Sequence, residues 1–322
     1  MPKTAFITGI TGQDGAYLSQ LLLEKGYTLV GLIRSVSPAN TGSLAYLGIE
    51  KQIIFEECDL LDITKIIKLL HQYQPTEIYN LAAQSSVSVS FSQPIGTLQF
   101  NITSVLNILE AIRLVNPQIK FYQASSSEMY GRVLDLPITE KTAFHPLSPY
   151  AISKATAHWT TVNYREAYGL FACCGVLFNH ESYLRSGNFF VKKIVKDCIS
   201  IYYKEKEFLE VGNIDLKRDF GYAPKYVEAM WLMLQQPIAD DYLICSGASV
   251  SLRSIILHAF NRFNISEDRL LIKENLFRPT EIIDNYGIAD KAKKQLNWVY
   301  DTDFYTILDL LIDEELQNWK KY

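Results

Sequence analysis

Short apolar runs alternate with longer segments of helical periodicity through the first half of the chain. The short runs predict strands at residues 4–8, 28–33, 52–55, 77–81, 120–124 and 171–177. The longer segments space their apolar residues three and four apart and predict helices at residues 16–25, 63–73, 97–115 and 149–168. Strands that alternate with helices favour a parallel sheet with helices on both faces. We therefore predict an α/β fold built on a doubly wound parallel sheet.

The pattern becomes less regular after residue 178, where the units are shorter and aromatic and charged residues are more frequent. This change predicts a smaller mixed α/β lobe over residues 179–322, with segments around 212–245 returning to the first domain, residues 1–178. Because no Pro/Gly/Ser-rich linker separates the two parts, we expect them to pack tightly around a cleft.

Composition narrows the class of protein further. Apolar residues make up 48% of the 322 residues and the net charge is −4, so we expect neither a nucleic acid nor a membrane as partner. The five cysteines show no CxxC spacing and predict buried thiols and no metal site. We find no signal peptide and no long apolar span, which predicts a cytoplasmic protein.

A glycine-rich turn follows the first predicted strand. Gly9, Gly12 and Gly15 have the spacing GxxGxxG and lie between a strand and a helix. Glycines at such a turn let the backbone approach a dinucleotide pyrophosphate, and the helix N-terminus binds it through free N–H groups. This loop, with Thr11, Gln13 and Asp14, is therefore predicted to bind a dinucleotide within a Rossmann-type fold.

The ends of the next strands predict the remaining cofactor contacts. The second strand ends at Arg34, Ser35 and Ser37 with no acidic residue nearby, and these side chains suit a 2′-phosphate, so we predict NADP. The loops after the third and fourth predicted strands are further cofactor candidates: Asp59, Leu60, Leu81, Ala82, Ala83, Gln84 and Ser85.

A second group of residues predicts proton transfer. Tyr150 and Lys154 are four apart and share a helix face, so the lysine charge is expected to lower the tyrosine pKa. Ser126 follows the fifth strand, at the sheet edge where α/β proteins bind ligands, and can hydrogen-bond a reacting oxygen. Glu128 adds a second base, which suits a carbon acid beside a ketone.

These residues resemble the extended short-chain dehydrogenase/reductase family and, within it, the GDP-mannose 4,6-dehydratases. The similarity runs over nearly the whole chain. It is carried by residues 7–15, 40–42, 76–81, 121–125, 177–182, 217–219, 226–231 and 278–281.

The resemblance implies a role for each catalytic candidate. Tyr150 would take the proton of the sugar 4-hydroxyl, while NADP takes hydride from C4 and later returns it to C6. Glu128 would remove the C5 proton and assist loss of the C6 hydroxyl as water. Ser126 would hold the 4-oxygen, and Lys154 would hold the nicotinamide ribose and tune Tyr150.

The resemblance also implies binding residues. His180 and Arg185 match positions that contact the cofactor, beside Tyr150 and Lys154. The positions matched to the GDP-sugar are Ser86, Ser126, Glu128, Asn179, Glu181, Asn188, Lys193, Gly212, Asn213, Arg218, Arg278 and Glu281.

The family assembles as homodimers or homotetramers, and the resemblance implies such an assembly here, with loop 34–42 reaching a neighbouring cofactor site in a tetramer. The chain departs from the family at several positions. Ser126 replaces a threonine, Ser35 an arginine, Leu147 an arginine, and Tyr183-Leu184 a proline-arginine pair. These changes weaken the tetramer inference and leave the sugar open.

Other functions remain open from the sequence. A GDP-4-keto-6-deoxymannose reductase shares much of the constellation, and another GDP-sugar, such as a GDP-heptose, is an alternative substrate. An epimerase or a simple C4 dehydrogenase of another nucleotide sugar is a third alternative, although Glu128 argues against both. A catalytically silent cofactor-binding regulator is a further alternative, against which the intact Ser126, Glu128, Tyr150 and Lys154 argue.

Overall fold

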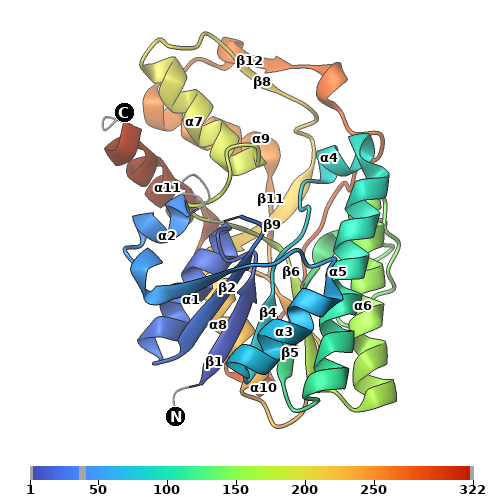
Figure 1. The fold of residues 1–322 in the computed structure, drawn as a ribbon. Helices are drawn as coiled ribbons and strands as arrows, with labels where there is room; N and C mark the ends of the chain where they lie inside the picture. Colours follow the sequence, from blue (N-terminus) through green and yellow to red (C-terminus); the bar gives the residue numbers. More distant parts are fainter. Residues whose placement is uncertain (1–2, 36–40, 320–322) are drawn as a thin grey trace.

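The computed structural model describes residues 3–35 and 41–319, and a parallel sheet lies at its centre (Figure 1). Its strands are β1 (Thr4–Thr8), β2 (Thr28–Ile33), β3 (Ile53–Glu57), β4 (Glu77–Asn80), β5 (Lys120–Ser126), β6 (Ala172–Leu177) and β10 (Tyr242–Ile244). They are ordered β10-β6-β5-β4-β1-β2-β3, and every pairing is parallel. The order reverses between β1 and β4, so the predicted doubly wound Rossmann-type sheet is confirmed.

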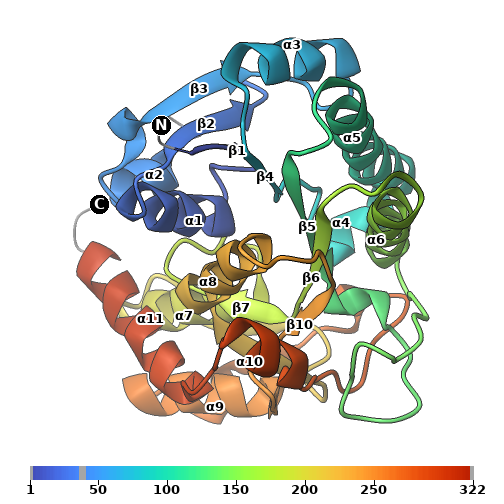
Figure 2. The same cartoon turned by 90° about the horizontal axis from the view of Figure 1, so that it is seen from below.

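Helices cover both faces of this sheet (Figure 2). One face carries α3 (Ile63–Tyr73), α5 (Pro94–Val115) and α6 (Pro149–Tyr168); the other carries α1 (Gln13–Glu24), α8 (Ala223–Leu234) and α10 (Asp290–Leu296). Apolar residues fill the space on each side, with Ile66, Leu109 and Phe121 in one core. Ile10, Leu18 and Met230 belong to the other. Both faces of the sheet are therefore buried under helices, which explains why the strands are continuous apolar runs.

The later part of the chain forms a smaller lobe beside the carboxyl ends of the strands (Figure 1). It contains a sheet ordered β11-β9-β7 and a β12-β8 pair. These strands are β7 (Asn179–Glu181), β8 (Leu209–Val211), β9 (Lys217–Tyr222), β11 (Ser249–Ser251) and β12 (Leu270–Ile272). The helices are α7 (Phe190–Tyr202), α9 (Leu252–Phe263) and α11 (Phe304–Trp319), which share a separate apolar core with Ile194, Ile255 and Leu308. Two short helices, α2 (Gly42–Tyr46) and α4 (Val87–Ser92), follow β2 and β4.

Local capping explains where the best-predicted helices begin and end. The Asp62 carboxylate accepts from the Thr64 and Lys65 backbone N–H groups at the start of α3. The Ser148 hydroxyl accepts from the Ala151 N–H at the start of α6, and Gly169 closes that helix with φ +68°. Both helices have the predicted bounds. In contrast, α1 begins three residues earlier than predicted, at Gln13, so its first turn lies within the glycine loop.

Helix α5 requires a correction. The sequence predicts no long apolar span, yet Pro94–Val115 is long and apolar enough to cross a membrane by length and composition. Its Val105, Ile108 and Ile112 side chains are buried in the core beneath the sheet, and the helix packs along α3 and α6. The apolar composition of α5 therefore serves the core of an α/β domain.

Candidate active site

The glycine loop joins β1 to α1 at the edge where the strand order reverses. Gly9 has φ +67°, and a Cβ there would lie 2.8 Å from the Ala82 backbone nitrogen, so a side chain does not fit. A Cβ on Gly15 would overlap the Gly9 carbonyl oxygen. Gly12 is the N-cap of α1 and supplies no side-chain acceptor. The loop therefore leaves the first N–H groups of α1 without a side-chain cap, as an anion-binding helix terminus requires.

Asp14 and His180 link this loop to the second lobe. His180 Nε2 lies 2.9 Å from both Asp14 carboxylate oxygens, and its Nδ1 lies 2.7 Å from the Phe178 carbonyl oxygen. Both ring nitrogens thus face acceptor oxygens, which fixes the orientation of the ring. Gln13 reinforces the link, because its amide donates to the His180 carbonyl and accepts from the Ser182 hydroxyl.

The Asp14–His180 pair predicts a pH-dependent contribution to stability. Burial alone raises the pKa of the Asp14 carboxyl, but the His180 charge and hydrogen bonds outweigh it and lower the pKa from 3.8 to about 2. The unfolded state then binds more protons between these values, so the stabilisation is present above pH 3.8 and is lost as pH falls towards 2. We expect Asp14→Asn to reduce the free energy of unfolding at neutral pH by about 2 kcal/mol. Urea unfolding at decreasing pH checks this, and a difference from wild type that does not shrink in acid contradicts it.

The other predicted cofactor residues lie at the same sheet edge or just beyond it. The loop from Leu81 to Ser85 follows β4, and Gln84 is fixed by Asn101, which accepts from its N–H at 2.8 Å. Arg34 and Ser35 are exposed at the end of β2, and Ser37 lies outside the described residues. Asp59 is exposed after β3, whereas Leu60 is buried in the core. Their roles toward a cofactor stay predictions.

Ser126, Tyr150 and Lys154 come together where β5 ends and α6 begins. Ser126 is the last residue of β5, two residues beyond the predicted strand end, and its hydroxyl lies close enough to the Tyr150 phenol to lower its pKa. Tyr150 is the second residue of α6, and Lys154 follows one turn later, with its Nζ 5.9 Å from the Tyr150 ring centroid. Both side chains are almost fully buried.

The pKa of Tyr150 differs from the sequence prediction. The prediction that Lys154 lowers this pKa is wrong, because burial raises it to about 12. Ser126 opposes the rise through its hydrogen bond, while the nearby Glu128 charge adds to it. The Lys154 ammonium instead donates to the Ala124 carbonyl at 2.8 Å, and its own burial lowers its pKa to about 8. The sequence gives the spacing of the pair but not this desolvation.

Glu128 faces a cavity of about 190 Å³ between the two lobes. Nine predicted residues line it: Glu128, Asn179, Glu181, Arg185, Gly212, Asn213, Arg218, Arg278 and Glu281. Three acidic and three basic side chains thus line the same cavity. This composition suits a ligand that carries both phosphates and hydroxyls. Arg218 is buried, and desolvation lowers its pKa although the Glu128 charge opposes this.

Glu181 and Arg185 form a half-satisfied pair on this cavity. Arg185 Nε lies 3.5 Å from Glu181 Oε1, without hydrogen-bond geometry, and Glu181 Oε2 has no hydrogen-bond partner among residues 3–35 and 41–319. Burial raises the pKa of Glu181, and the Arg185 charge only partly opposes the rise. Buried polar atoms without partners are costly, so this pair is well placed to bind polar groups of a ligand. Arg185, predicted as a cofactor contact, lies on this cavity.

Four predicted substrate residues do not line the cavity: Ser126, which lies beside Tyr150 as described above, and Ser86, Asn188 and Lys193. Ser86 caps α4 by accepting from the Val89 N–H. Lys193 pairs with Asp197 at 2.7 Å and donates to the Glu210 carbonyl. Asn188 is exposed just before α7. Their contacts with substrate stay predictions.

The sequence analysis did not identify the apolar cavity walls, which include Phe189, Phe190, Leu216, Phe220 and Leu276. Such residues have the same sequence signal as core residues, so only the fold separates the two roles. Their position beside charged residues in the chain, as for Leu216 before Lys217 and Arg218, is the one available indication.

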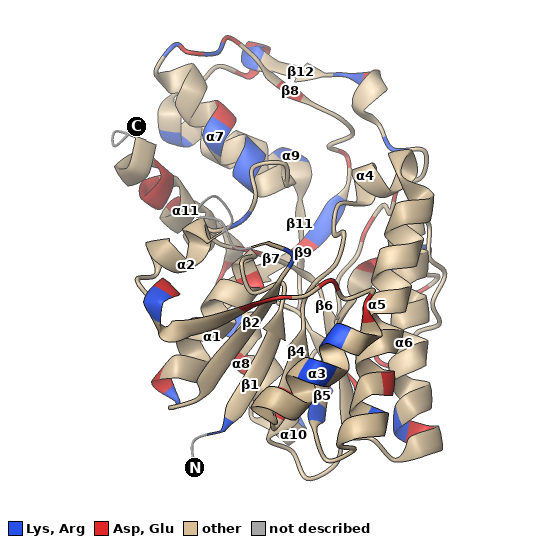
Figure 3. Cartoon of the chain, viewed as in Figure 1, with Lys and Arg blue, Asp and Glu red and all other residues tan. Residues whose placement is uncertain are grey.

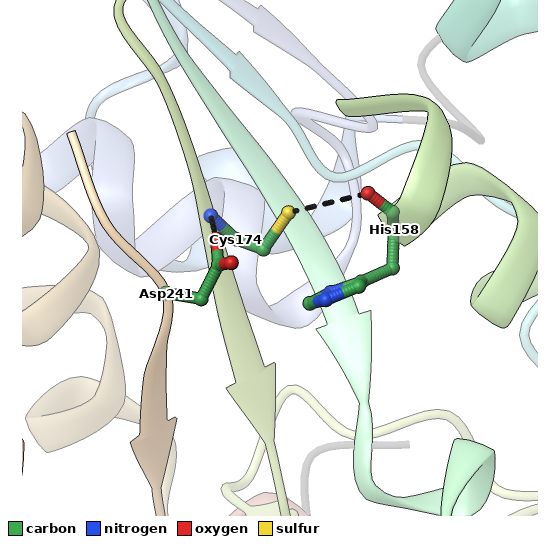
Figure 4. A group of neighbouring side chains, drawn as sticks. All are labelled: His158, Cys174 and Asp241. Atoms are coloured by element: carbon green, nitrogen blue, oxygen red, sulfur yellow. Dashed lines mark hydrogen bonds between the residues drawn. The ribbon is translucent and has the colours of Figure 1, made fainter. Parts of the chain in front are cut away.

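A second polar cluster lies behind the sheet edge and is not a metal centre in its present arrangement. His158, Cys174 and Asp241 bring one potential ligand atom each within 4.8 Å of one another (Figure 4). The Asp241 carboxylate, however, binds the Arg165 guanidinium through two hydrogen bonds and accepts from the Cys174 N–H. The Cys174 thiol donates to the His158 carbonyl, and burial raises its pKa well above the usual range. Neighbouring positive charge and a neutral thiol both disfavour a cation.

The doubly wound sheet, the glycine loop and the Ser126–Tyr150–Lys154 group define an extended short-chain dehydrogenase/reductase. The family model described as GDP-mannose 4,6 dehydratase matches residues 6–311. The chain is 44% identical over 330 residues to GDP-mannose 4,6 dehydratase 1 of Arabidopsis thaliana, covering 99% of this chain and 91% of that protein. The human GDP-mannose 4,6 dehydratase is 41% identical over 323 residues, covering 92% of this chain and 87% of that protein. The chain therefore belongs to the GDP-mannose 4,6 dehydratase family.

A solved structure agrees with this fold. The dTDP-glucose 4,6-dehydratase from Streptomyces venezuelae superimposes with a TM-score of 0.88, covering 99% of this chain and 98% of that chain. Its sequence identity is 18%, so the match supports the fold alone.

Proposed function

We propose that this protein converts GDP-mannose to GDP-4-keto-6-deoxymannose with loss of water. The observation that carries the proposal is the position of Glu128, which lines the cavity between the lobes and follows Ser126 by two residues. A dehydrogenase needs only the hydroxyl pair Ser126 and Tyr150, whereas removal of a C5 proton needs an additional base at the substrate. Membership of the GDP-mannose 4,6 dehydratase family supports the same reaction.

Each active-site side chain has a role in this reaction that follows from its functional group. Tyr150 accepts the O4 proton of the sugar, and Ser126 holds that oxygen through its hydroxyl. Lys154 holds the nicotinamide ribose through its ammonium group. Glu128 removes the C5 proton, made acidic by the neighbouring C4 ketone, and delivers a proton to the departing C6 hydroxyl. The proton first taken by Tyr150 balances the one that C5 regains, so only water is lost.

The glycine loop supports a nicotinamide dinucleotide as the cofactor. A Cβ at Gly9 would collide with the Ala82 backbone and one at Gly15 with the Gly9 carbonyl, so glycines keep this turn tight, and the α1 N-terminus it leads into has no side-chain cap, which fits a pyrophosphate. When bound, the nicotinamide ring supplies reversible hydride chemistry, accepting hydride from C4 and returning it to C6. The proposed cofactor contacts are those predicted from the sequence, from Gly9–Gly15 to the loops after β2, β3 and β4, together with Tyr150, Lys154, His180 and Arg185.

We expect Gly15→Ala to weaken this site. The added methyl overlaps the Gly9 carbonyl and the Ile10 backbone, so the loop has to shift, at a cost of about 1–3 kcal/mol. Titration with NADPH, followed by its fluorescence, should show a Kd at least about tenfold higher than that of wild type. A tenfold change in Kd corresponds to about 1.4 kcal/mol, which lies within the expected cost of the shift. Gly96→Ala is the matched control, because a Cβ there meets no atom within 4 Å. Unchanged affinity for Gly15→Ala would place the dinucleotide elsewhere.

NADP is the proposed form of the cofactor because β2 ends at exposed Arg34 and Ser35. A guanidinium binds a 2′-phosphate, whereas a carboxylate there would bind ribose hydroxyls and repel the phosphate. We expect Arg34→Glu to raise the Kd for NADP by about tenfold or more while changing the Kd for NAD little. Calorimetric titration with each dinucleotide checks this, and an equal loss for both contradicts the assignment.

In this proposal the two lobes bind different ligands. Residues 1–178 bind mainly the cofactor, and of the segments around 212–245 only α8 and β10 rejoin this domain. Residues 179–322 bind mainly the nucleotide sugar. The arginines Arg185, Arg218 and Arg278 suit the diphosphate, because guanidinium groups bind phosphate in a bidentate manner. Ser86, Asn188 and Lys193 remain proposed contacts of the nucleotide sugar.

A homodimer is the proposed minimum assembly. The outer surface of α5 and α6 forms an open apolar groove lined by Leu106, Pro146, Ile152, Trp159 and Tyr164. Figure 3 shows these helices without charged residues over much of their length, and Trp159 is 59% exposed. An uncharged aromatic patch of this kind is typical of a subunit interface. A cytoplasmic location is also proposed, supported by the five free, buried cysteines.

The testing experiment incubates GDP-mannose with the purified protein and catalytic NADP and follows the sugar nucleotide by mass spectrometry. Loss of one water without net consumption of cofactor supports the dehydratase. Unchanged GDP-mannose in a protein that binds NADP overturns it. A parallel reaction with the 4-keto product and NADPH tests the reductase, which would consume one NADPH per sugar.

A further inference from the structure

A buried ion pair in the second lobe lies next to the active-site segment without lining the cavity. Lys192 on α7 and Glu315 on α11 are in direct contact, and their side chains are only 10% and 9% exposed. Burial lowers the pKa of Lys192, although the Glu315 charge and hydrogen bond oppose this. Two buried charges rarely stabilise a fold more than apolar side chains of the same size would. We therefore looked for a role of this ion pair other than stabilising the fold.

Lys192 makes a third contact, to the segment that follows β7. Its ammonium donates to the Tyr183 carbonyl oxygen at 2.7 Å and lies 4.0 Å from the centroid of the Tyr183 ring. The ring also packs against Tyr46 of α2, with centroids 4.6 Å apart. Tyr183 is therefore held by α7, by α11 through Glu315, and by α2.

The same segment carries active-site side chains on either side of Tyr183. Before it, Ser182 donates to Gln13 of the glycine loop. After it, the Arg185 N–H donates to the Ser182 carbonyl at 3.1 Å, which closes a tight turn. The Arg185 guanidinium then lies over the Phe189 ring at 3.7 Å and lines the cavity. The direction of Arg185 thus depends on a turn whose middle is held by Lys192.

We propose that Lys192 is a positioning residue, which fixes the turn at residues 182–185 so that Arg185 faces the nucleotide sugar. Glu315 keeps the Lys192 ammonium in place, so the C-terminal helix α11 contributes to substrate affinity from outside the cavity. This inference rests on the proposed function for its ligand. It concerns binding and not chemistry, because Ser126, Glu128, Tyr150 and Lys154 lie on β5, α6 and the loop between them.

The test compares four variants with wild type. Lys192→Met removes the ammonium and keeps the aliphatic stem, and we expect KM for GDP-mannose to rise about tenfold with little change in kcat, as for loss of one charged hydrogen bond. Lys192→Arg restores a donor and should restore KM. Lys196→Met, an exposed lysine on the same helix, is the matched control and should behave as wild type.

The double variant Lys192→Met/Glu315→Met separates positioning from stability. Replacing both charges with apolar side chains should recover the stability that Lys192→Met loses. It does not restore the donor to the Tyr183 carbonyl, so the raised KM should persist. Recovery of KM together with stability would overturn the inference, as would an unchanged KM in Lys192→Met.

Amide hydrogen exchange supplies a readout that needs no substrate. The Leu184 and Arg185 N–H groups both donate to Ser182, so a loosened turn should exchange faster at these two amides in Lys192→Met and in the double variant. Unchanged exchange there contradicts the inference. If wild type leaves GDP-mannose unchanged, the proposed function fails, whereas the exchange experiment still decides whether Lys192 holds the turn.

Discussion

Replacing Glu128 with glutamine is expected to stop water elimination while the sugar is still oxidised at C4. The amide keeps the shape of the side chain but cannot accept the C5 proton, so kcat should fall by about 10²–10⁴-fold. Because hydride cannot return to C6 without elimination, reduced cofactor should accumulate to one equivalent per active site. Absorbance of the reduced nicotinamide and mass spectrometry of the sugar nucleotide measure the two effects together.

The control for this variant is Glu166→Gln, which removes an exposed carboxylate from α6 and should keep wild-type turnover. Two results would contradict the role of Glu128. Product formation at the wild-type rate would make another group the C5 base. Loss of both elimination and cofactor reduction, with substrate still bound, would place Glu128 at the oxidation step instead.

Local sequence signals fix much of the first domain. The bounds of α3 and α6 were predictable because side-chain caps at Asp62 and Ser148 mark their starts. β10 was not predicted as a strand, since Tyr242–Ile244 is three residues long and pairs with β6, more than sixty residues earlier in the chain. Such short strands exist only through tertiary pairing, which a local pattern does not contain.

The candidate site shows the same division between what is local and what is not. The spacing of Tyr150 and Lys154 and the position of Ser126 follow from one helix and one strand end, so the sequence predicts their proximity. The pKa of Tyr150 depends on burial, and the direction of Arg185 depends on a turn held by α7 and α11. The local sequence predicts neither the pKa of Tyr150 nor the direction of Arg185, because both depend on elements that are far apart in the chain.

Tyr150→Phe is expected to abolish oxidation as well as elimination, which distinguishes it from Glu128→Gln. The ring remains, but no group accepts the O4 proton, so turnover should fall by about 10²–10⁴-fold and no reduced cofactor should appear. Tyr168→Phe, at an exposed position of the same helix, is the matched control.

The pH dependence of the oxidation step tests the same residue in the wild type. Burial raises the pKa of Tyr150 to about 12, so the base form is scarce at neutral pH. Below that pKa each unit of pH increases the phenolate fraction about tenfold. We expect the single-turnover rate of cofactor reduction to rise with pH in wild type and the residual rate in Tyr150→Phe to stay flat. A rising profile in Tyr150→Phe would assign the proton transfer to a different group, and a normal reduction rate in that variant would remove Tyr150 from the chemistry.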